Sequence, residues 1–236
     1  MKNNREMKPT GNYGEAVVVV VDVQKDFCPG GALGVNDGDK VVPPINELTD
    51  WVRGQGGAVV FTRDKHPAQT KHFDKWPIHC VADTPGYEFH PDLIVKENDA
   101  IASKGMSTED DGYSGFDAII EPGRSRMGDL VANLPDAERT VGNAIGRIVR
   151  INQALGKRTI AFVPGIAGDY CVPATDEPLV ELDPEWLDVV WIENAVKSVN
   201  EVDGEHAKQA LMEAGMYAMT VDEIINGGIV IGRGEQ

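Results

Sequence analysis

The chain has 236 residues, of which 42% are hydrophobic and 25% charged, and its formal net charge at pH 7 is −16. This composition is typical of globular proteins, and the length suits one α/β domain with a full core. A surface this acidic repels phosphate backbones and anionic lipids. The charge therefore argues against nucleic acid and membranes as partners.

The chain has three cysteines, Cys28, Cys80 and Cys171. A small, odd number argues against a disulfide framework and favours a reducing compartment, so we expect a cytoplasmic protein. No apolar stretch approaches the roughly 20 residues of a membrane-spanning helix. Residues 1–15 are polar, and we predict a flexible N-terminal arm followed by a single domain over residues 16–236.

Short apolar runs predict the strands of the fold. They lie at Ala16–Val23, Ala58–Thr62, Asp99–Ala102, Thr159–Val163, Leu187–Ile192 and Tyr217–Thr220. Several are continuously apolar, as in strands that are buried on both faces of a parallel sheet.

Helical patterns alternate with these strands, at Val41–Gly54, Glu138–Leu155 and Gly204–Gly215. Strands that alternate with helices imply βαβ units. We therefore predict an α/β fold, a doubly wound and mainly parallel central sheet with helices on both faces. The segment Glu121–Asp136 is rich in proline, glycine and charge and has no clear period, so we interpret it as a surface insertion.

Cys171 is the first candidate for chemistry. It follows the strand Thr159–Val163 by way of Pro164-Gly165, which places its thiol on a tight strand-to-helix turn. The N-terminus of a helix carries a partial positive charge that favours a thiolate. The position predicts a nucleophile, which then needs a base, a cation and an oxyanion site.

Asp22 and Lys104 are candidates for two of these roles. Asp22 ends the valine-rich strand, where an aspartate ordinarily caps a turn; alternatively it is a general base whose pKa is raised by burial. Most lysines are solvated, but Lys104 follows the strand Asp99–Ala102 and could lie between Asp22 and Cys171, where its charge would lower the pKa of the thiol. Because strand ends of a doubly wound sheet share an edge, we expect Asp22, Asp64 and Cys171 to meet.

A second cluster contains metal-ligating residue types. Asp64 and His66 are two residues apart after a strand, so their side chains face one way in an extended chain, and His72 and His79 follow in a short loop. This spacing predicts a divalent-metal site with mixed nitrogen and oxygen ligands, and zinc, iron and manganese all fit it. The alternative is a set of unrelated loop histidines.

The remaining candidates have simpler interpretations. We expect Cys28 and Cys80 to behave as small buried apolar residues. Trp76 and Tyr113 either belong to the core or form walls of a pocket for a flat aromatic substrate.

Together the motifs resemble the nicotinamidase/pyrazinamidase family of the isochorismatase-like cysteine hydrolases. They occur in the family's order and extend over about residues 16–200. The matching segments are Asp22-Val23-Gln24-Lys25-Asp26-Phe27-Cys28-Pro29-Gly30-Gly31-Ala32-Leu33, Thr62-Arg63-Asp64-Lys65-His66-Pro67, Lys71-His72-Phe73, Trp76-Pro77-Ile78-His79-Cys80, Lys104-Gly105, Tyr113-Ser114-Gly115-Phe116 and Gly165-Ile166-Ala167-Gly168-Asp169-Tyr170-Cys171-Val172.

The resemblance implies a role for each matched residue. Catalysis would involve the triad Asp22, Lys104 and Cys171. The metal ligands would be Asp64, His66 and His79, with His72 as a fourth ligand in some members. The substrate would contact Phe27, Leu33, Trp76, Tyr113 and Ile166. The resemblance also implies a cis peptide at Ile166–Ala167, which would bring the N–H of Ala167 beside that of Cys171 to form the oxyanion site.

The implied activity is conversion of nicotinamide to nicotinic acid and ammonia, and also hydrolysis of pyrazinamide, through a cysteine acyl-enzyme. One divalent metal ion would be the cofactor, with zinc expected and iron or manganese as alternatives, and a homo-oligomer is left open. A metal-free cysteine amidohydrolase acting on carbamoyl or other small amides is an alternative, although such relatives lack the metal residues. A non-catalytic binding module is the third interpretation. The chain departs from the family pattern at Gly168, where threonine is common, and at Asp176, where alanine is common.

Overall fold

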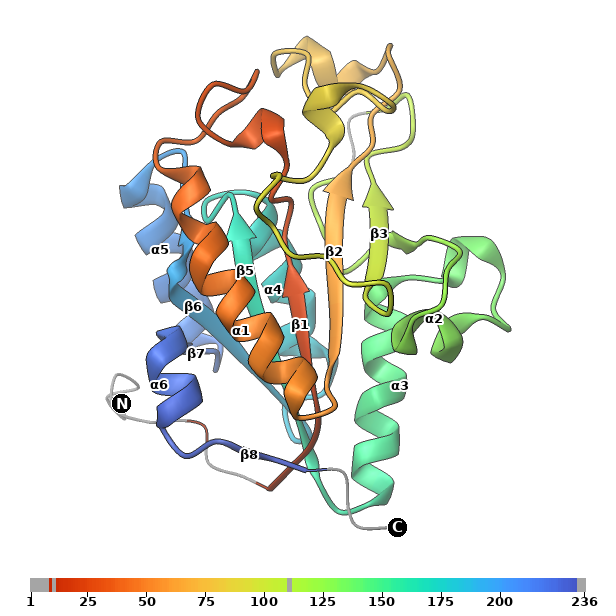
Figure 1. The fold of residues 1–236 in the computed structure, drawn as a ribbon, viewed down its shortest axis with the longest axis vertical. Helices are drawn as coiled ribbons and strands as arrows, with labels where there is room; N and C mark the ends of the chain where they lie inside the picture. Colours follow the sequence, from red (N-terminus) through yellow and green to blue (C-terminus); the bar gives the residue numbers. More distant parts are fainter. Residues whose placement is uncertain (1–8, 10–11, 110–111, 233–236) are drawn as a thin grey trace.

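The computed structural model describes residues 9, 12–109 and 112–232. In this part of the chain the strands form one sheet in the order β4-β3-β2-β1-β5-β6-β7, with β8 paired to β1 (Figure 1). The strands are β1 (Asn12–Val20), β2 (Ala58–Asp64), β3 (Ala100–Lys104), β4 (Ile119–Ile120), β5 (Arg158–Ile166), β6 (Leu187–Lys197), β7 (Tyr217–Met219) and β8 (Val230–Ile231). Only the β3–β4 pair of this sheet is antiparallel, so the predicted, mainly parallel sheet is confirmed.

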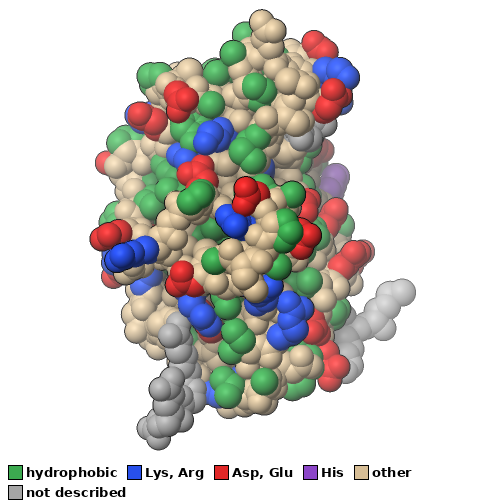
Figure 2. Space-filling view, turned by 90° about the vertical axis from the view of Figure 1, so that its right-hand side faces the viewer, with side chains coloured by type: hydrophobic (Ala, Val, Ile, Leu, Met, Phe, Trp, Pro, Cys, Tyr) green, Lys and Arg blue, Asp and Glu red, His purple; other side chains and the backbone are tan. Residues whose placement is uncertain are grey.

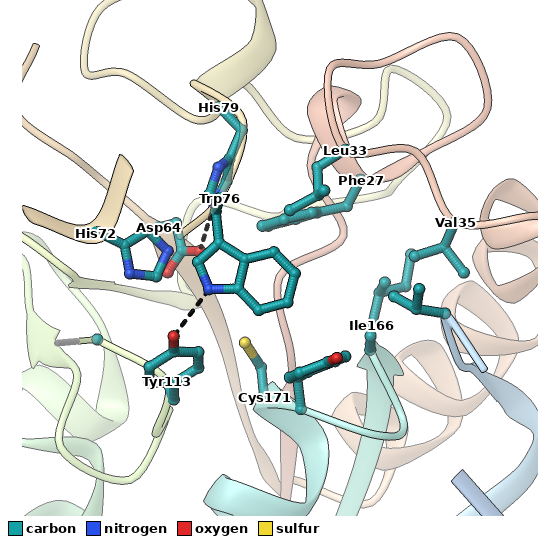
Figure 3. Close-up of a pocket in the computed structure, with 14 residues that line it drawn as sticks. Phe27, Leu33, Val35, Asp64, His72, Trp76, His79, Tyr113, Ile166 and Cys171 are labelled. Carbon is teal, nitrogen blue, oxygen red and sulfur yellow. Dashed lines mark hydrogen bonds and ion pairs between the residues drawn. The ribbon is translucent and has the colours of Figure 1, made fainter. Parts of the chain in front are cut away.

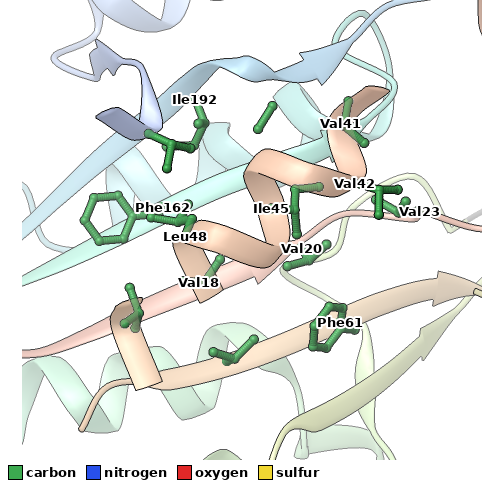
Figure 4. Close-up of a cluster of buried hydrophobic side chains, with 14 of the residues drawn as sticks. Val18, Val20, Val23, Val41, Val42, Ile45, Leu48, Phe61, Phe162 and Ile192 are labelled. Carbon is green, nitrogen blue, oxygen red and sulfur yellow. The ribbon is translucent and has the colours of Figure 1, made fainter. Parts of the chain in front are cut away.

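The valine run of β1 is explained by burial on both faces. Val18 and Val20 belong to the core beneath α1 (Val42–Gly54), together with Ile45 and Leu48 (Figure 4). Val17 and Val19 point to the opposite core. Successive side chains of a strand face opposite ways, so a central strand that is covered on both sides has no polar face.

The helices cover both faces of the sheet, as predicted. α1 and α6 (Val221–Asn226) pack on one face, and the other face carries α2 (Arg126–Val131), α3 (Val141–Ala154), α4 (Cys171–Leu182) and α5 (Glu201–Glu213). The arrangement is the doubly wound one, with the carboxyl ends of the parallel strands at one edge.

Side-chain caps determine where two of the helices begin. The Thr140 hydroxyl accepts the N–H of Asn143, so α3 starts at Val141 rather than at the predicted Glu138. The side chain of Asn200 accepts the N–H of Val202, so α5 starts three residues before the predicted Gly204. Caps satisfy backbone donors that have no partner within the helix.

Two predictions about segments are wrong in part. The segment Glu121–Asp136 contains α2, whose Met127 and Val131 are buried in the core and whose first turn is capped by Ser125. Six helical residues are too few to show a period, which is why the pattern was not visible.

The other correction concerns the predicted N-terminal arm. Residues 12–15 belong to β1, because Asn12 pairs with Val230 of β8 and the buried Tyr13 hydroxyl donates to Asp188 Oδ2 at 2.5 Å. Apart from Pro9, the rest of the predicted arm lies outside the described residues.

Acidic and basic side chains are interspersed on the face shown in Figure 2, so that face does not present a single sign of charge despite the net charge of −16. Within the described residues, no helix is long and apolar enough to span a membrane.

Candidate active site

Four polar side chains meet at the carboxyl edge of the sheet. Asp64 is the last residue of β2 and Lys104 is the last of β3, and the two are paired in the strand register. Asp22 follows the end of β1 by two residues, and Cys171 is the first residue of α4 after β5. Because β3, β2, β1 and β5 are consecutive parallel strands, their ends bring the residues together.

Lys104 lies at the centre of this group. Its Nζ is 2.8 Å from Asp22 Oδ2 and 2.5 Å from Asp64 Oδ1, and it also lies 3.6 Å from Cys171 Sγ. A further hydrogen bond runs from Nζ to the carbonyl oxygen of Gly112 at 2.5 Å. The lysine is buried, and two carboxylates compensate its charge.

The charges around Lys104 explain the pKa directions of the ion group. Burial alone would lower the pKa of Lys104, but Asp22 and Asp64 outweigh it and raise the pKa well above its ordinary value. Burial alone would raise the pKa of Asp64, but the charge of Lys104 holds it below the ordinary value. The ammonium and the Asp64 carboxylate are therefore both charged at neutral pH.

Asp22 differs from Asp64, because burial dominates and raises the pKa of Asp22. Lys104 lowers this pKa, and so does Thr62, whose hydroxyl donates to Asp22 Oδ1 at 2.7 Å. The direction is the one predicted for a general base in a dry crevice.

For the thiol, the predicted effect of Lys104 is present, but other effects outweigh it. Lys104 does lower the pKa of Cys171, as expected, but burial outweighs it, and the negative charges of Asp22 and Asp64 add to the effect of burial. The net result is a pKa well above the ordinary value. The thiol therefore keeps its proton at rest and needs a partner that accepts it.

The turn before Cys171 exposes two backbone donors. The Ile166–Ala167 peptide is cis, as the resemblance implied. Ala167 O accepts the N–H groups of Tyr170 and Val172, which closes the turn. Among the described residues, no acceptor is bonded to the N–H of Ala167 or of Cys171, and both residues line the same pocket.

Three buried histidines, His66, His72 and His79, form a group whose ligand atoms all lie within 4.8 Å of one another. His66 Nδ1 bonds to the carbonyl oxygen of Gly105 at 2.9 Å, and His79 Nδ1 bonds to that of Pro77 at 2.7 Å. A carbonyl accepts only, so each Nδ1 carries the proton and each Nε2 presents a lone pair.

These residues fit a divalent metal ion. His66 Nε2 is buried without a hydrogen-bond partner in the described structure, and burial lowers the pKa of His79, which keeps it neutral. Asp64 Oδ2 lies 3.5 Å from His66 Nε2 and 3.9 Å from His79 Nε2. His72 stacks on His66 with ring centroids 4.4 Å apart, so the structure brings all four predicted ligands together.

A mostly apolar pocket joins Cys171 to His72 and His79 (Figure 3). All five residues predicted to contact substrate line it: Phe27, Leu33, Trp76, Tyr113 and Ile166. Trp76 Nε1 donates to the Tyr113 hydroxyl at 2.9 Å, which fixes the indole over the pocket. Flat aromatic walls with a few polar groups at one end suit a small planar ligand.

The sequence interpretation missed five residues of the site. Val35, Gly112, Tyr170 and Val199 also line the pocket, and Tyr170 contacts Trp76 edge to face with centroids 5.1 Å apart. Gln24 is buried and clamps the backbone of Asp64: its Oε1 accepts the N–H at 2.8 Å and its Nε2 donates to the carbonyl oxygen at 2.9 Å. The position of Gln24 directly after a buried strand could have indicated its role from the sequence, whereas nothing in the sequence around Val199 indicates that it lines the pocket.

Cys28 and Cys80 are buried free thiols, as predicted. Burial raises the pKa of Cys28 to about 11 and that of Cys80 beyond the accessible range, and neither lines the pocket at Cys171. Both are packing residues.

Residues 16–116 match the isochorismatase domain. The chain is similar to the nicotinamidase of Escherichia coli (strain K12), with 31% identity over 86% of this chain and 94% of that protein. It is also similar to the nicotinamidase/pyrazinamidase of Mycobacterium tuberculosis, with 33% identity over 68% of this chain and 92% of that one. Among solved structures, the pyrazinamidase of Pyrococcus horikoshii in complex with zinc matches with 30% identity and a TM-score of 0.66, over 87% of this chain and 99% of the other.

Proposed function

The chain belongs to the nicotinamidase family of isochorismatase-like hydrolases, and from this premise we propose that it hydrolyses nicotinamide, and also pyrazinamide, to the carboxylic acid and ammonia. One observation supports this above the others. One aromatic-walled pocket is lined by the thiol of Cys171 and by His72 and His79 of the three-histidine group. Behind it, Cys171 contacts Lys104, which is paired with the buried Asp22. Cys171, Asp22 and Lys104 are the catalytic residues of this proposal.

In the first half of the reaction, Asp22 accepts the proton of the Cys171 thiol. The sulfur then bonds to the carboxamide carbon, and the negative charge that develops on the carbonyl oxygen is stabilised by the N–H groups of Ala167 and Cys171. Asp22 returns the proton to the nitrogen, the C–N bond breaks and ammonia leaves. The acyl group stays on sulfur as a thioester.

In the second half, Asp22 takes a proton from a water molecule, whose oxygen attacks the thioester carbon. The C–S bond breaks, the thiol regains its proton, and the acid leaves. Lys104 keeps its proton throughout, because two carboxylates raise its pKa. Its positive charge stabilises the thiolate and the ionised form of Asp22 in turn.

Asp64, His66, His72 and His79 would hold the divalent ion, for which zinc is the first candidate and iron or manganese the alternatives. When bound, such an ion supplies a Lewis-acidic contact for the ring nitrogen of the substrate. The aromatic walls Phe27 and Trp76 then orient the ring, so that the carboxamide faces Cys171.

The metal-ligating set also bears on the alternatives. A metal-free relative acting on linear amides has no use for three buried histidines whose possible ligand atoms lie within 4.8 Å of one another. A non-catalytic module has no use for a thiol beside a buried Asp–Lys pair. The three free thiols further support a cytoplasmic location.

The decisive experiment compares wild type with Cys171→Ala in an ammonia-release assay on nicotinamide, pyrazinamide and a linear amide. We expect the variant to lose at least about 10³-fold in kcat while its unfolding curve stays close to that of wild type, because only the sulfur is removed. Retained turnover in the variant refutes the covalent mechanism. Turnover of the linear amide alone supports the metal-free alternative instead.

A further inference from the structure

The turn that carries the nucleophile is bound to a distant segment of the chain. We define the nucleophile turn as Gly168–Cys171 and the outer segment as Lys197–Asn200, which joins β6 to α5. The N–H of Gly168 donates to the carbonyl oxygen of Lys197 at 2.9 Å. The carboxylate of Asp169 accepts two more bonds, from the N–H of Val199 at 3.0 Å and from that of Asn200 at 2.8 Å.

The two segments are also packed closely together. Ser198 is buried in the outer segment, and a Cβ atom placed on Gly168 would lie 2.6 Å from its Oγ and 2.7 Å from Val196 Cγ1. A Cβ atom on Gly204 would lie 2.0 Å from the same Oγ. The space for a side chain at position 168, where threonine is common in the family, is therefore filled here by Ser198.

Asp169 connects the oxyanion site with the wall of the pocket. In sequence it lies two residues after Ala167 and two residues before Cys171, whose N–H groups form the oxyanion site of the proposed function. In space it holds the backbone of Val199, which lines the outer side of the pocket with 56% of its surface exposed. One carboxylate thus ties the oxyanion donors to the outer wall of the pocket.

The charge of this side chain suits its place. Asp169 accepts both bonds from backbone N–H groups at the start of α5, a 13-residue helix whose N-cap is Asn200. Bonds to a carboxylate are shorter and stronger than those to a neutral acceptor, and the N-terminus of a helix favours negative charge. An alanine at this position leaves the two N–H groups to water and frees the outer segment.

From this geometry we infer that Asp169 is a positioning residue, which keeps the oxyanion N–H groups and the Val199 wall in one fixed arrangement. The inference rests on the proposed function for its catalytic consequence. Asp169 acts through the backbone, and the reacting atoms are touched by other groups. Because displacements of about 1 Å in a site can cost about 100-fold in rate, a loosened turn lowers kcat and a loosened wall raises KM.

The test compares Asp169→Ala and Asp169→Asn with a matched control, Ser125→Ala. The control removes a helix cap of α2 beside the start of β2, at the opposite end of that strand from Asp64. We expect Asp169→Ala to lose about 10- to 100-fold in kcat/KM with contributions from both parameters, and Asp169→Asn, which keeps one acceptor oxygen, to recover part of the loss. Ser125→Ala should leave kcat and KM unchanged, although it lowers the free energy of unfolding by an amount similar to that in Asp169→Ala.

Hydrogen exchange supplies a readout that needs no substrate. We expect the amides of Val199 and Asn200 to exchange faster in Asp169→Ala than in wild type and in Ser125→Ala. Kinetic parameters within about twofold of wild type, or unchanged exchange at these two amides, overturn the inference. If wild type hydrolyses no carboxamide, the proposed function fails. The exchange experiment still tests the bonds of Asp169 to the outer segment: faster exchange in Asp169→Ala supports them, and unchanged exchange refutes them.

Discussion

The carboxyl group of Asp176 should destabilise this protein at neutral pH. It lies within α4, fully buried, and neither of its oxygens has a hydrogen-bond partner among the described residues. Burial alone raises the pKa of Asp176 well above its ordinary value of 3.8. Its neighbours one turn away on the helix, Val172 and Leu179, belong to the apolar core, so nothing compensates a charge there.

The effect on stability depends on pH in a defined direction. A raised pKa means that the folded protein binds this proton more tightly than the unfolded chain does. The contribution of Asp176 is therefore most favourable below pH 3.8, the unfolded value, and is lost as the pH rises towards the pKa in the folded state. The loss is about 1.4 kcal/mol for each pH unit in this window.

Asp176→Asn separates the charge from the shape, because an amide of the same size does not ionise. Urea unfolding of wild type and variant at pH 5, 6 and 7 should show the variant gaining on wild type by about 1.4 kcal/mol per pH unit, as long as the folded-state pKa lies above the range. Relative to Asp176→Asn, Asp176→Ala should raise the free energy of unfolding by about 1–3 kcal/mol at every pH, because it removes an unpartnered polar group. The small cavity that it leaves reduces this gain.

A constant difference between wild type and Asp176→Asn across this pH range contradicts the reasoning. It would mean that Asp176 is either solvated or paired in solution. The two variants distinguish these cases, since Asp176→Ala destabilises a protein whose carboxylate is paired.

Three further predictions concern the site. Lys104→Met should cost about 3–5 kcal/mol in the urea unfolding free energy, because Asp22 and Asp64 lose the cation between them, and ammonia release should fall with it; an unchanged midpoint contradicts the buried ion group. Thr62→Val removes a donor to Asp22, which raises the pKa of this base, so the acidic limb of kcat/KM should move about one pH unit higher; an unmoved limb means another group controls it. His66→Ala, or treatment with a chelator, should lower bound metal in elemental analysis and raise KM more than it lowers kcat, whereas unchanged kinetics in metal-free protein refutes the anchoring role.

The central sheet was predictable because its signals are local. The valine run of β1 and the apolar runs of β2 and β5 are continuous, and burial on both faces leaves no polar position in such strands. A residue at the end of a parallel strand is also fixed in space by the topology, so Asp64 and Lys104 could be placed before their distance was known. Sequence alone does not show the first residues of β1, Asn12–Glu15, since they depend on a pairing with β8 far along the chain.

Contacts between loops were not predictable in the same way. Val199 lines the pocket, and its N–H is bonded to Asp169, 30 residues away in sequence; no periodicity encodes that bond. The same limit applies to the direction in which the pKa of the Cys171 thiol shifts. Lys104 lies near Cys171, as predicted. The net shift, however, also depends on the burial of the thiol and on two carboxylates, which the sequence does not quantify.

The raised pKa of the thiol is compatible with its role as nucleophile once the buried charges are taken together. In the proposed mechanism Asp22 is ionised at rest, so the carboxylates of Asp22 and Asp64 and the ammonium of Lys104 leave the group with one net negative charge, while the thiol of Cys171 is neutral. Loss of the thiol proton to solvent would place a second negative charge on a half-buried sulfur beside two carboxylates, which is costly. Transfer of the same proton to Asp22 leaves the net charge unchanged, and Lys104 contacts both the donor and the acceptor. The site therefore favours formation of the thiolate by internal transfer, in the presence of substrate, over a thiolate that persists in the resting protein.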